Sequence, residues 1–162
     1  MEIKRRNVNL LLGFLVCALL IAIIASVLKP MSFNDTAAKR ETEVIERMKV
    51  IRSAEARYRK INNGVFCSSI DSLVMQGYLA DSLKYIPYSD GKKFEISTNF
   101  ITNSNGSNVH VMECRAYYED YLKGLSEEYV ADMTNEAVAN GFFPGVKFGD
   151  LTMPSDNRGN WE

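Results

Sequence analysis

The chain has 162 residues, of which 46% are hydrophobic and 24% are charged, and its formal net charge is -1. This length suits one globular domain with a modest core beside a membrane segment, and two domains would be crowded. The near-neutral charge, with Lys and Arg interleaved with Glu, gives no basic field, so we expect no nucleic-acid partner.

The first predicted element is an uncharged apolar run, VNLLLGFLVCALLIAIIASVL, at residues 8–28. As a helix it would be about 31 Å long, which matches the hydrocarbon thickness of a bilayer. A removable signal peptide is the alternative, but its apolar region usually has only about 7 to 15 residues. The run therefore predicts an uncleaved transmembrane helix and a membrane as partner.

The flanks of this run predict its orientation. Lys4, Arg5 and Arg6 lie in a short tail before it, which favours a cytoplasmic N-terminus and a domain outside the cytoplasm. Small side chains let helices approach closely within a membrane. The candidate residues for such self-association are Gly13, Ala18, Ala22 and Ala25.

A second helix is predicted at residues 37–61, after Lys29 and Pro30 end or kink the first. An apolar stripe on helical spacing includes Val44, Met48 and Ile51, and Glu43–Arg47 and Glu55–Arg59 are favourable i, i+4 pairs. The stripe has two interpretations. It packs on the chain's own sheet, or its upper part, residues 37–50, pairs with neighbouring copies, which adds Val44, Met48 and Ile51 to the self-association set.

The rest of the chain reads as a small α+β domain. A short helix capped by Ser68 or Ser69 and closed by Gly77 precedes two alternating strands, one from Lys93 and one from Val109, joined by a polar turn. A third strand through residues 115–118 is separate from the second or merges with it. A helix begins after Ser126, and the Gly-, Pro- and Asn-rich tail is predicted to be mostly loop.

These elements predict four parts. They are a cytoplasmic tail (residues 1–7), a transmembrane helix (8–28), a linker with an amphipathic stalk helix (29–62), and an extracytoplasmic α+β head (63–162) that packs with the lower stalk helix. The expected fold class is therefore α+β: a membrane helix, then a long helix on a small antiparallel sheet, with a C-terminal helix.

This layout resembles the type IV pilins and the pseudopilins of type II secretion. The local similarity is best at residues 47–79, RMKVIRSAEARYRKINNGVFCSSIDSLVMQGYL. The residues that carry it are Tyr58, Gly64, Phe66, Leu73, Gly77, Tyr78 and Leu79. The resemblance implies a structural subunit in the inner membrane, with its domain in the periplasm, that associates with copies of itself or with related pilin-like subunits.

The processing site of that family is a glycine before Phe or Met, with a glutamate five residues into the mature chain. Gly13 and Phe14 match its first half, but Ala18 stands at the glutamate position. We therefore expect a divergent, uncleaved relative rather than a conventional major pilin.

The sequence predicts no enzyme and no catalytic, cofactor or metal site. His110 is the only histidine, which excludes multi-histidine metal sites, and it reads as a strand residue on the polar face. By position alone, Asp150, Asp156 and Asn157 are the counterparts of the calcium loop of the major pseudopilins, but solvated loop residues are the favoured interpretation.

Cys67 and Cys114 leave two alternatives open. They pair as a disulfide in an oxidising compartment, or they are two buried thiols that never meet.

The sequence thus favours a pilin-like or pseudopilin-like structural subunit, part of a secretion or surface-fibre assembly, without a small-molecule substrate. The alternative is a membrane-anchored monomeric periplasmic binding or accessory module, which would recognise its ligand through the hairpin tip and the Gly-rich tail.

Overall fold

The computed structural model describes the backbone of residues 2–102 and 105–162, and within the first helix it describes the side chains of residues 11–24 and from 31 onward. The chain forms two compact units, Met1–Thr36 and Ala37–Glu162. We call them the N-terminal unit and the C-terminal unit.

Helix α1 extends over Glu2–Ile61. Of the two alternatives for Lys29 and Pro30, an end or a kink of the first helix, the end is wrong, since the backbone is helical on both sides of Pro30. A proline removes one backbone donor, and the hydrogen bonds of the neighbouring turns are enough to continue the helix. Among the residues that the structure describes, we find no helix with the length and apolarity to cross a membrane. The ends of the predicted span, residues 8–10 and 25–28, lie outside the described side chains.

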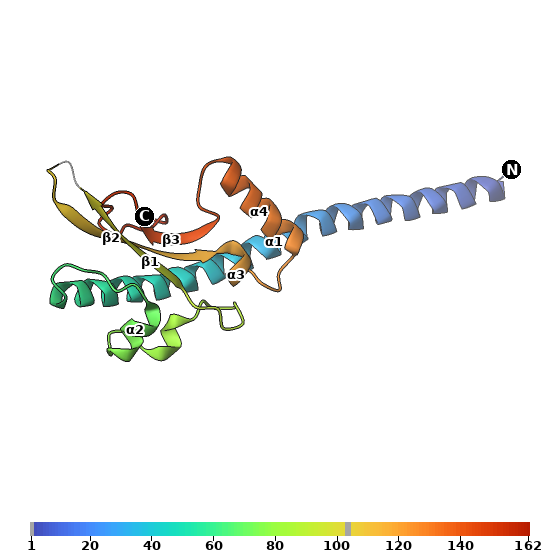
Figure 1. The fold of residues 1–162 in the computed structure, drawn as a ribbon. Helices are drawn as coiled ribbons and strands as arrows, with labels where there is room; N and C mark the ends of the chain where they lie inside the picture. The colour runs from blue at the N-terminus through green and yellow to red at the C-terminus, as the bar shows by residue number, and fades with distance from the viewer. Residues whose placement is uncertain (1, 103–104) are drawn as a thin grey trace. The chain divides into compact units, whose positions relative to one another are not determined.

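Short elements precede the sheet of the C-terminal unit (Figure 1). Helix α2 (Ile70–Met75) follows Ser69 and ends before Gly77, as predicted, and the 3-10 helix η1 (Asp81–Lys84) comes next. After the first two strands come helices α3 (Tyr118–Tyr121) and α4 (Glu127–Ala139).

The sheet has three antiparallel strands in the order β1 (Glu95–Thr102), β2 (Asn108–Tyr117) and β3 (Gly145–Gly149). Strands β1 and β2 form the predicted hairpin, with Glu95 opposite Arg115 and Thr102 opposite Asn108. The α+β fold with a long helix and a small antiparallel sheet is therefore confirmed.

Of the two alternatives for residues 115–118, merging with the second strand is confirmed for residues 115–117, which belong to β2. The third strand of the sheet is β3, which lies in the tail that was predicted to be mostly loop. Gly145 and Gly149 have positive φ, and a Cβ at either position would collide with the backbone of Ala116 or Met112 on β2. The two glycines therefore permit close approach to β2 at the ends of β3.

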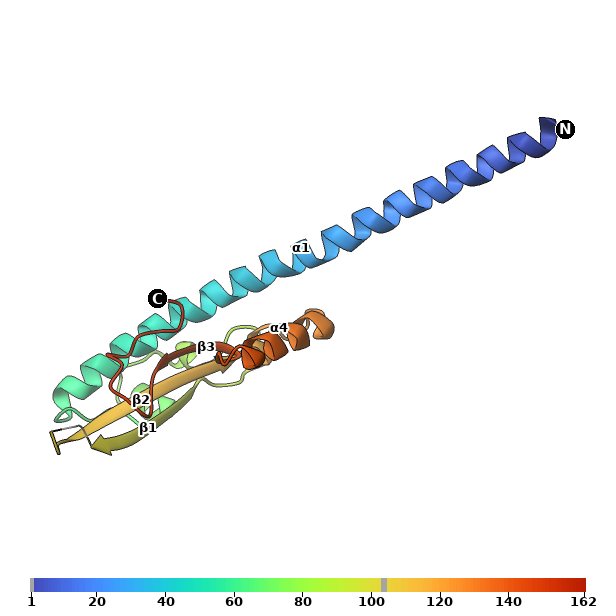
Figure 2. The same ribbon diagram turned by 90° about the horizontal axis from the view of Figure 1, so that it is seen from above.

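The core of the C-terminal unit lies between the sheet and residues 37–61 of α1, which run alongside the strands in both ribbon views (Figures 1 and 2). Val44, Met48 and Ile51 are completely buried there. This corrects their assignment to a self-association surface, because a neighbouring copy cannot reach them. The stripe packs within its own unit, which was the first of the two interpretations.

Candidate functional site

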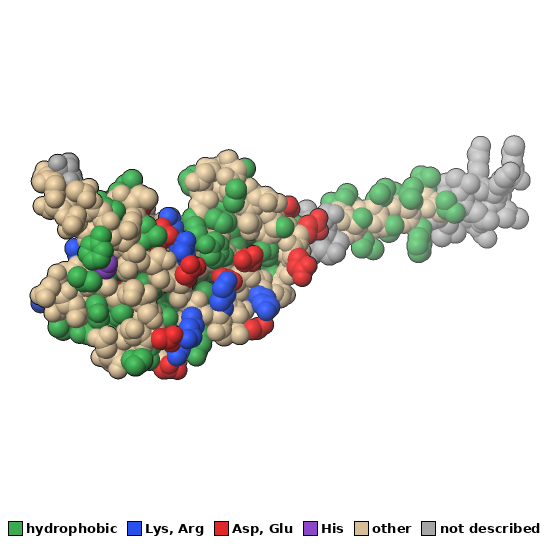
Figure 3. Space-filling model, in the orientation of Figure 1, with side chains coloured by type: hydrophobic (Ala, Val, Ile, Leu, Met, Phe, Trp, Pro, Cys, Tyr) green, Lys and Arg blue, Asp and Glu red, His purple; other side chains and the backbone are tan. Residues whose placement is uncertain are grey.

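The most unusual surface of the chain is the apolar segment, which we define as residues 11–24 of α1. All its described side chains are exposed (Figure 3), and the exposed fraction reaches 74% for Leu11 and 82% for Phe14. A contiguous apolar surface of this kind marks contact with a membrane or with another protein, because leaving it in water is costly.

The small residues predicted for self-association lie on this segment. Gly13, Ala18 and Ala22 are exposed, and a Cβ added at Gly13 would meet no atom within 4 Å. The side chain of Ala25 lies outside the described residues. The segment therefore presents close-approach positions among large apolar side chains, which is the composition of packed membrane helices.

Glu55, which the sequence pattern paired with Arg59, is a carboxylate buried in the core. Glu55 has no exposed area, its Oε2 accepts the backbone N–H of Cys67 at 3.0 Å, and its Oε1 has no hydrogen-bond partner among the described residues. Burial raises the pKa of Glu55 to about 7, although the bond from Cys67 acts in the opposite direction. The predicted ion pair with Arg59 is absent, since Arg59 donates to the carbonyl of Gly64.

The two cysteines of the C-terminal unit are buried free thiols in the structure, which is the second alternative left open by the sequence. Burial, and the nearby charge of Glu55, raise the pKa of both Cys67 and Cys114. A thiol with a raised pKa is a poor nucleophile at neutral pH, so neither position has the electropositive setting of a reactive cysteine.

His110 does not lie on a polar face, which corrects that prediction. Its Nδ1 accepts the backbone N–H of Phe66 at 2.7 Å, and its ring lies 4.3 Å from the ring of Phe100. Burial, and the nearby charge of Arg59, lower the pKa of His110. The neutral imidazole therefore anchors the turn that contains Phe66, and nothing positions it as a general base.

The residues compared with a calcium loop do not converge. Asp150 Oδ1 accepts hydrogen bonds from the Thr152 N–H and hydroxyl, each at 2.6 Å, so the carboxylate is committed to its own turn. Asp156 and Asn157 have φ near +50°, which is typical of turns. Within the described residues, no group of three or more metal-ligating side chains comes together.

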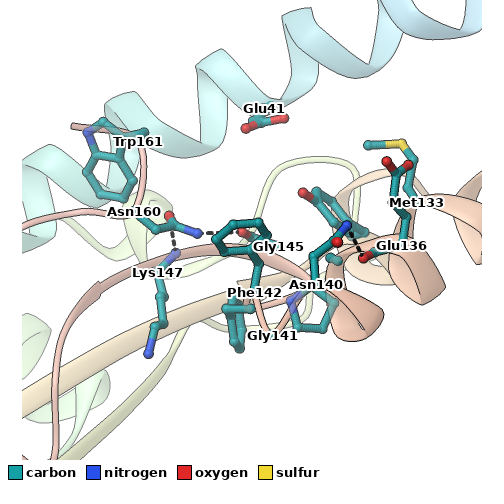
Figure 4. Close-up of a pocket in the computed structure, with 14 residues that line it drawn as sticks. Glu41, Met133, Glu136, Asn140, Gly141, Phe142, Gly145, Lys147, Asn160 and Trp161 are labelled. Atoms are coloured by element: carbon teal, nitrogen blue, oxygen red, sulfur yellow. Dashed lines mark hydrogen bonds between the residues drawn. The ribbon is translucent and has the colours of Figure 1, made fainter.

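A groove of about 860 Å³ lies between α1, α4 and the C-terminal tail, and we call it the α4 groove (Figure 4). Helix α1 contributes Glu41, α4 contributes Met133, Glu136 and Ala137, and the tail contributes Trp161. Its other lining residues are Tyr118, Asn140, Gly141, Phe142, Phe143, Pro144, Gly145, Lys147 and Asn160. The volume lies in the range of ligand-binding pockets, and aromatic side chains form much of the wall.

The electrostatics of the α4 groove are those of an acidic site. Burial raises the pKa of Glu41. Burial also raises the pKa of the Tyr118 hydroxyl, and the charges of Glu41 and Glu136 add to this effect. Glu41 on α1 and Glu136 on α4 therefore act on the same hydroxyl. Neither takes part in an ion pair among the described residues.

Lys147 is the one cationic residue among those that line the groove, and it does not neutralise these acids. Its Nζ lies 2.7 Å from Glu113 Oε2, and Figure 4 shows its side chain extending away from Glu41. This groove is not apparent in the sequence, because its walls come from residues far apart in the chain: 41, 118, 133–147 and 160–161. The clearest sequence signal was that α4 carries four acids and no basic residue.

No protein-family model, curated protein or solved structure matches this chain, so its function is inferred from its own residues and fold.

Proposed function

We propose that this chain is a pilin-like or pseudopilin-like structural subunit of a secretion or surface-fibre assembly. Residues 8–28 anchor it in the inner membrane, its C-terminal unit lies in the periplasm, and copies or related subunits associate through the apolar segment. It performs no catalysis. The observation that carries the proposal is the exposed apolar segment at the start of a helix that extends over Glu2–Ile61.

The amino-acid composition of the segment supports both parts of the proposal. Its large aliphatic side chains favour the bilayer interior over water. Gly13, Ala18 and Ala22 lower the steric cost of helix contact, so copies that meet in the plane of the membrane can pack their backbones closely.

The fold of the C-terminal unit supports the likeness to pilins more weakly. The second half of α1 packs on a small antiparallel sheet, as the resemblance at residues 47–79 implies. A fold hosts many functions, so this observation alone would not select the subunit over the anchored monomeric module.

Cysteine scanning in native membranes tests the subunit hypothesis. Cys17 is exposed and would be replaced by Ser to give a parent without a cysteine in the segment. Gly13→Cys, Ala18→Cys and Ala22→Cys are then introduced one at a time and oxidised with copper phenanthroline. We expect disulfide-linked dimers whose yield changes along the helix with a period of three to four residues.

Ala139→Cys is the matched control, because it is an exposed helical alanine in α4, outside the segment. A dimer yield at positions 13, 18 and 22 no higher than at 139 would reject self-association and favour the monomeric module. Finding the protein in the soluble fraction after membranes are sedimented would reject the anchor as well.

A further inference from the structure

We propose that the α4 groove is a docking site for a segment of a partner protein that carries an arginine or lysine side chain. The cation would lie between the carboxylates of Glu41 and Glu136, against the aromatic wall. This inference does not depend on self-association through the apolar segment.

Charge complementarity selects this occupant. The chain as a whole is close to neutral, yet Glu41 and Glu136 lack cationic partners among the described residues, and Lys147 is held by Glu113. Glu41 is half-buried, and a half-buried carboxylate without a partner is unfavourable, so an incoming cation would relieve that cost. An anionic or neutral occupant would not relieve this cost. Glu136 is exposed and contributes its charge to the attraction.

An aromatic ring provides the second element of recognition. Tyr118, Phe143 and Trp161 line the same groove. Arg52 already lies over the ring of Trp161 and Lys147 over that of Phe143, so Tyr118 is the ring of the three that no cation of the described residues covers. Guanidinium and ammonium groups bind over aromatic faces, with an added contribution of about 0.5 to 2 kcal/mol. A flexible aliphatic stem beneath the charged group would also cover part of the apolar wall.

The position of α4 also fits a docking element. It has no buried residue, and Val138 and Phe142 beside the groove are 60% and 72% exposed. A second cavity of about 400 Å³ borders its other side, lined by Val130, Ala131 and Thr134 among others. A partner segment on this helix would cover apolar surface that the chain leaves in water.

The test uses the full-length protein in detergent micelles and the fluorescence of Trp161, which is the only tryptophan. The probe is the blocked tripeptide acetyl-Leu-Arg-Leu-amide. The matched probe replaces Arg with citrulline, which keeps the shape and removes the charge. We expect a saturable fluorescence change with the arginine peptide and at least tenfold weaker binding of the citrulline peptide.

Three variants locate the site. Glu41→Gln with Glu136→Gln should weaken binding of the arginine peptide at least tenfold, because two charge-assisted contacts are lost. Glu136→Lys, at an exposed position where folding is not at risk, should abolish it. Glu128→Gln is the control, since Glu128 lies on α4 outside the groove and should change affinity less than twofold.

Three results would overturn the proposal. Equal affinity for the arginine and citrulline peptides would show apolar docking only. An equal loss in Glu128→Gln would show a general effect of the acidic helix. The same saturable change with calcium chloride alone, abolished by Glu136→Lys, would show a metal site instead. Cross-linking through the apolar segment is unaffected by any of these results, so the two hypotheses fail separately.

Discussion

Two helices of the C-terminal unit, residues 37–61 of α1 and helix α4, have similar sequence patterns and different environments. Each carries an apolar stripe on helical spacing. In α1 the stripe is completely buried, with no exposed area at Val44, Met48, Ile51 or Ala54, whereas α4 has no buried residue. Periodicity therefore identifies the apolar face of a helix, but how deeply that face is covered depends on the elements around it.

This difference in burial indicates different roles for the two helices: residues 37–61 of α1 stabilise the unit, and α4 is available for recognition of a partner. Residues 37–61 of α1 lie along the whole sheet, so their side chains carry the hydrophobic free energy of the unit. Helix α4 lies between two cavities and is left partly open. We expect mutations in α1 to change the free energy of unfolding and mutations in α4 to change binding.

The largest expected effect compares two methionines. Met48→Ala should lower the free energy of unfolding by about 2 to 5 kcal/mol, because Met48 is completely buried and its removal leaves a cavity. Met133→Ala, at a half-buried position in α4, should cost less than about 1 kcal/mol. Urea unfolding of the full chain in detergent, followed by circular dichroism, measures both. Equal costs would contradict the division between the two helices.

The next effect concerns Glu55, whose carboxylate is buried within residues 37–61 of α1. The pKa of Glu55 is about 7 in the folded state and 4.5 ordinarily, so the folded state binds more protons between these values. The free energy of unfolding should therefore fall as pH rises from 4.5 to 7, by up to about 3 kcal/mol, and stay low above pH 7.

Glu55→Gln should remove this pH dependence, since the amide does not titrate and can still accept the N–H of Cys67. The difference between the pH profiles of wild type and variant isolates Glu55 from His110, whose lowered pKa acts with the opposite sign. Parallel profiles would show that Glu55 is not the titrating group. Met48→Ala serves as the control, because it lowers stability without changing a titratable group.

Hydrogen exchange should show the same division in the native state. The amides of Glu127–Ala139 should exchange at least tenfold faster than those of residues 44–58, because a helix without buried residues opens locally at lower cost. Mass spectrometry of peptic fragments measures both regions in one experiment. The arginine peptide should slow exchange in α4 and leave residues 44–58 unchanged, which links this measurement to the proposed docking site.

Much of the fold follows from local sequence signals. The hairpin, the short helix between Ser69 and Gly77, and the start of α4 after Ser126 were all predicted, because strand alternation and caps depend on neighbouring residues. Strand β3 was missed because its two glycines are also turn signals. Their role is visible only when Ala116 and Met112 are placed beside them.

The polar contacts were harder to predict than the elements. Glu43 and Arg47 formed a plausible pair in sequence, but Glu43 accepts the hydroxyl of Tyr88, and Arg47 donates to the carbonyl of Tyr85. Glu55 follows Ile51 by four residues, on the apolar stripe, and this position was the available signal of its burial. The partners of long polar side chains depend on the tertiary structure. The i, i+4 rules therefore predict these partners poorly once other elements pack on the helix.

The smallest expected effect is at the start of α4. Ser126 is the N-cap residue, but its side chain makes no capping hydrogen bond. Ser126→Ala should therefore lower the free energy of unfolding by only a few tenths of a kcal/mol, whereas loss of a capping bond costs about 1 kcal/mol. Urea unfolding of the full chain measures it, with Met133→Ala as the comparison within α4. A cost above about 1 kcal/mol would mean that α4 is held at its first turn, and that its exposed face is better anchored than its burial indicates.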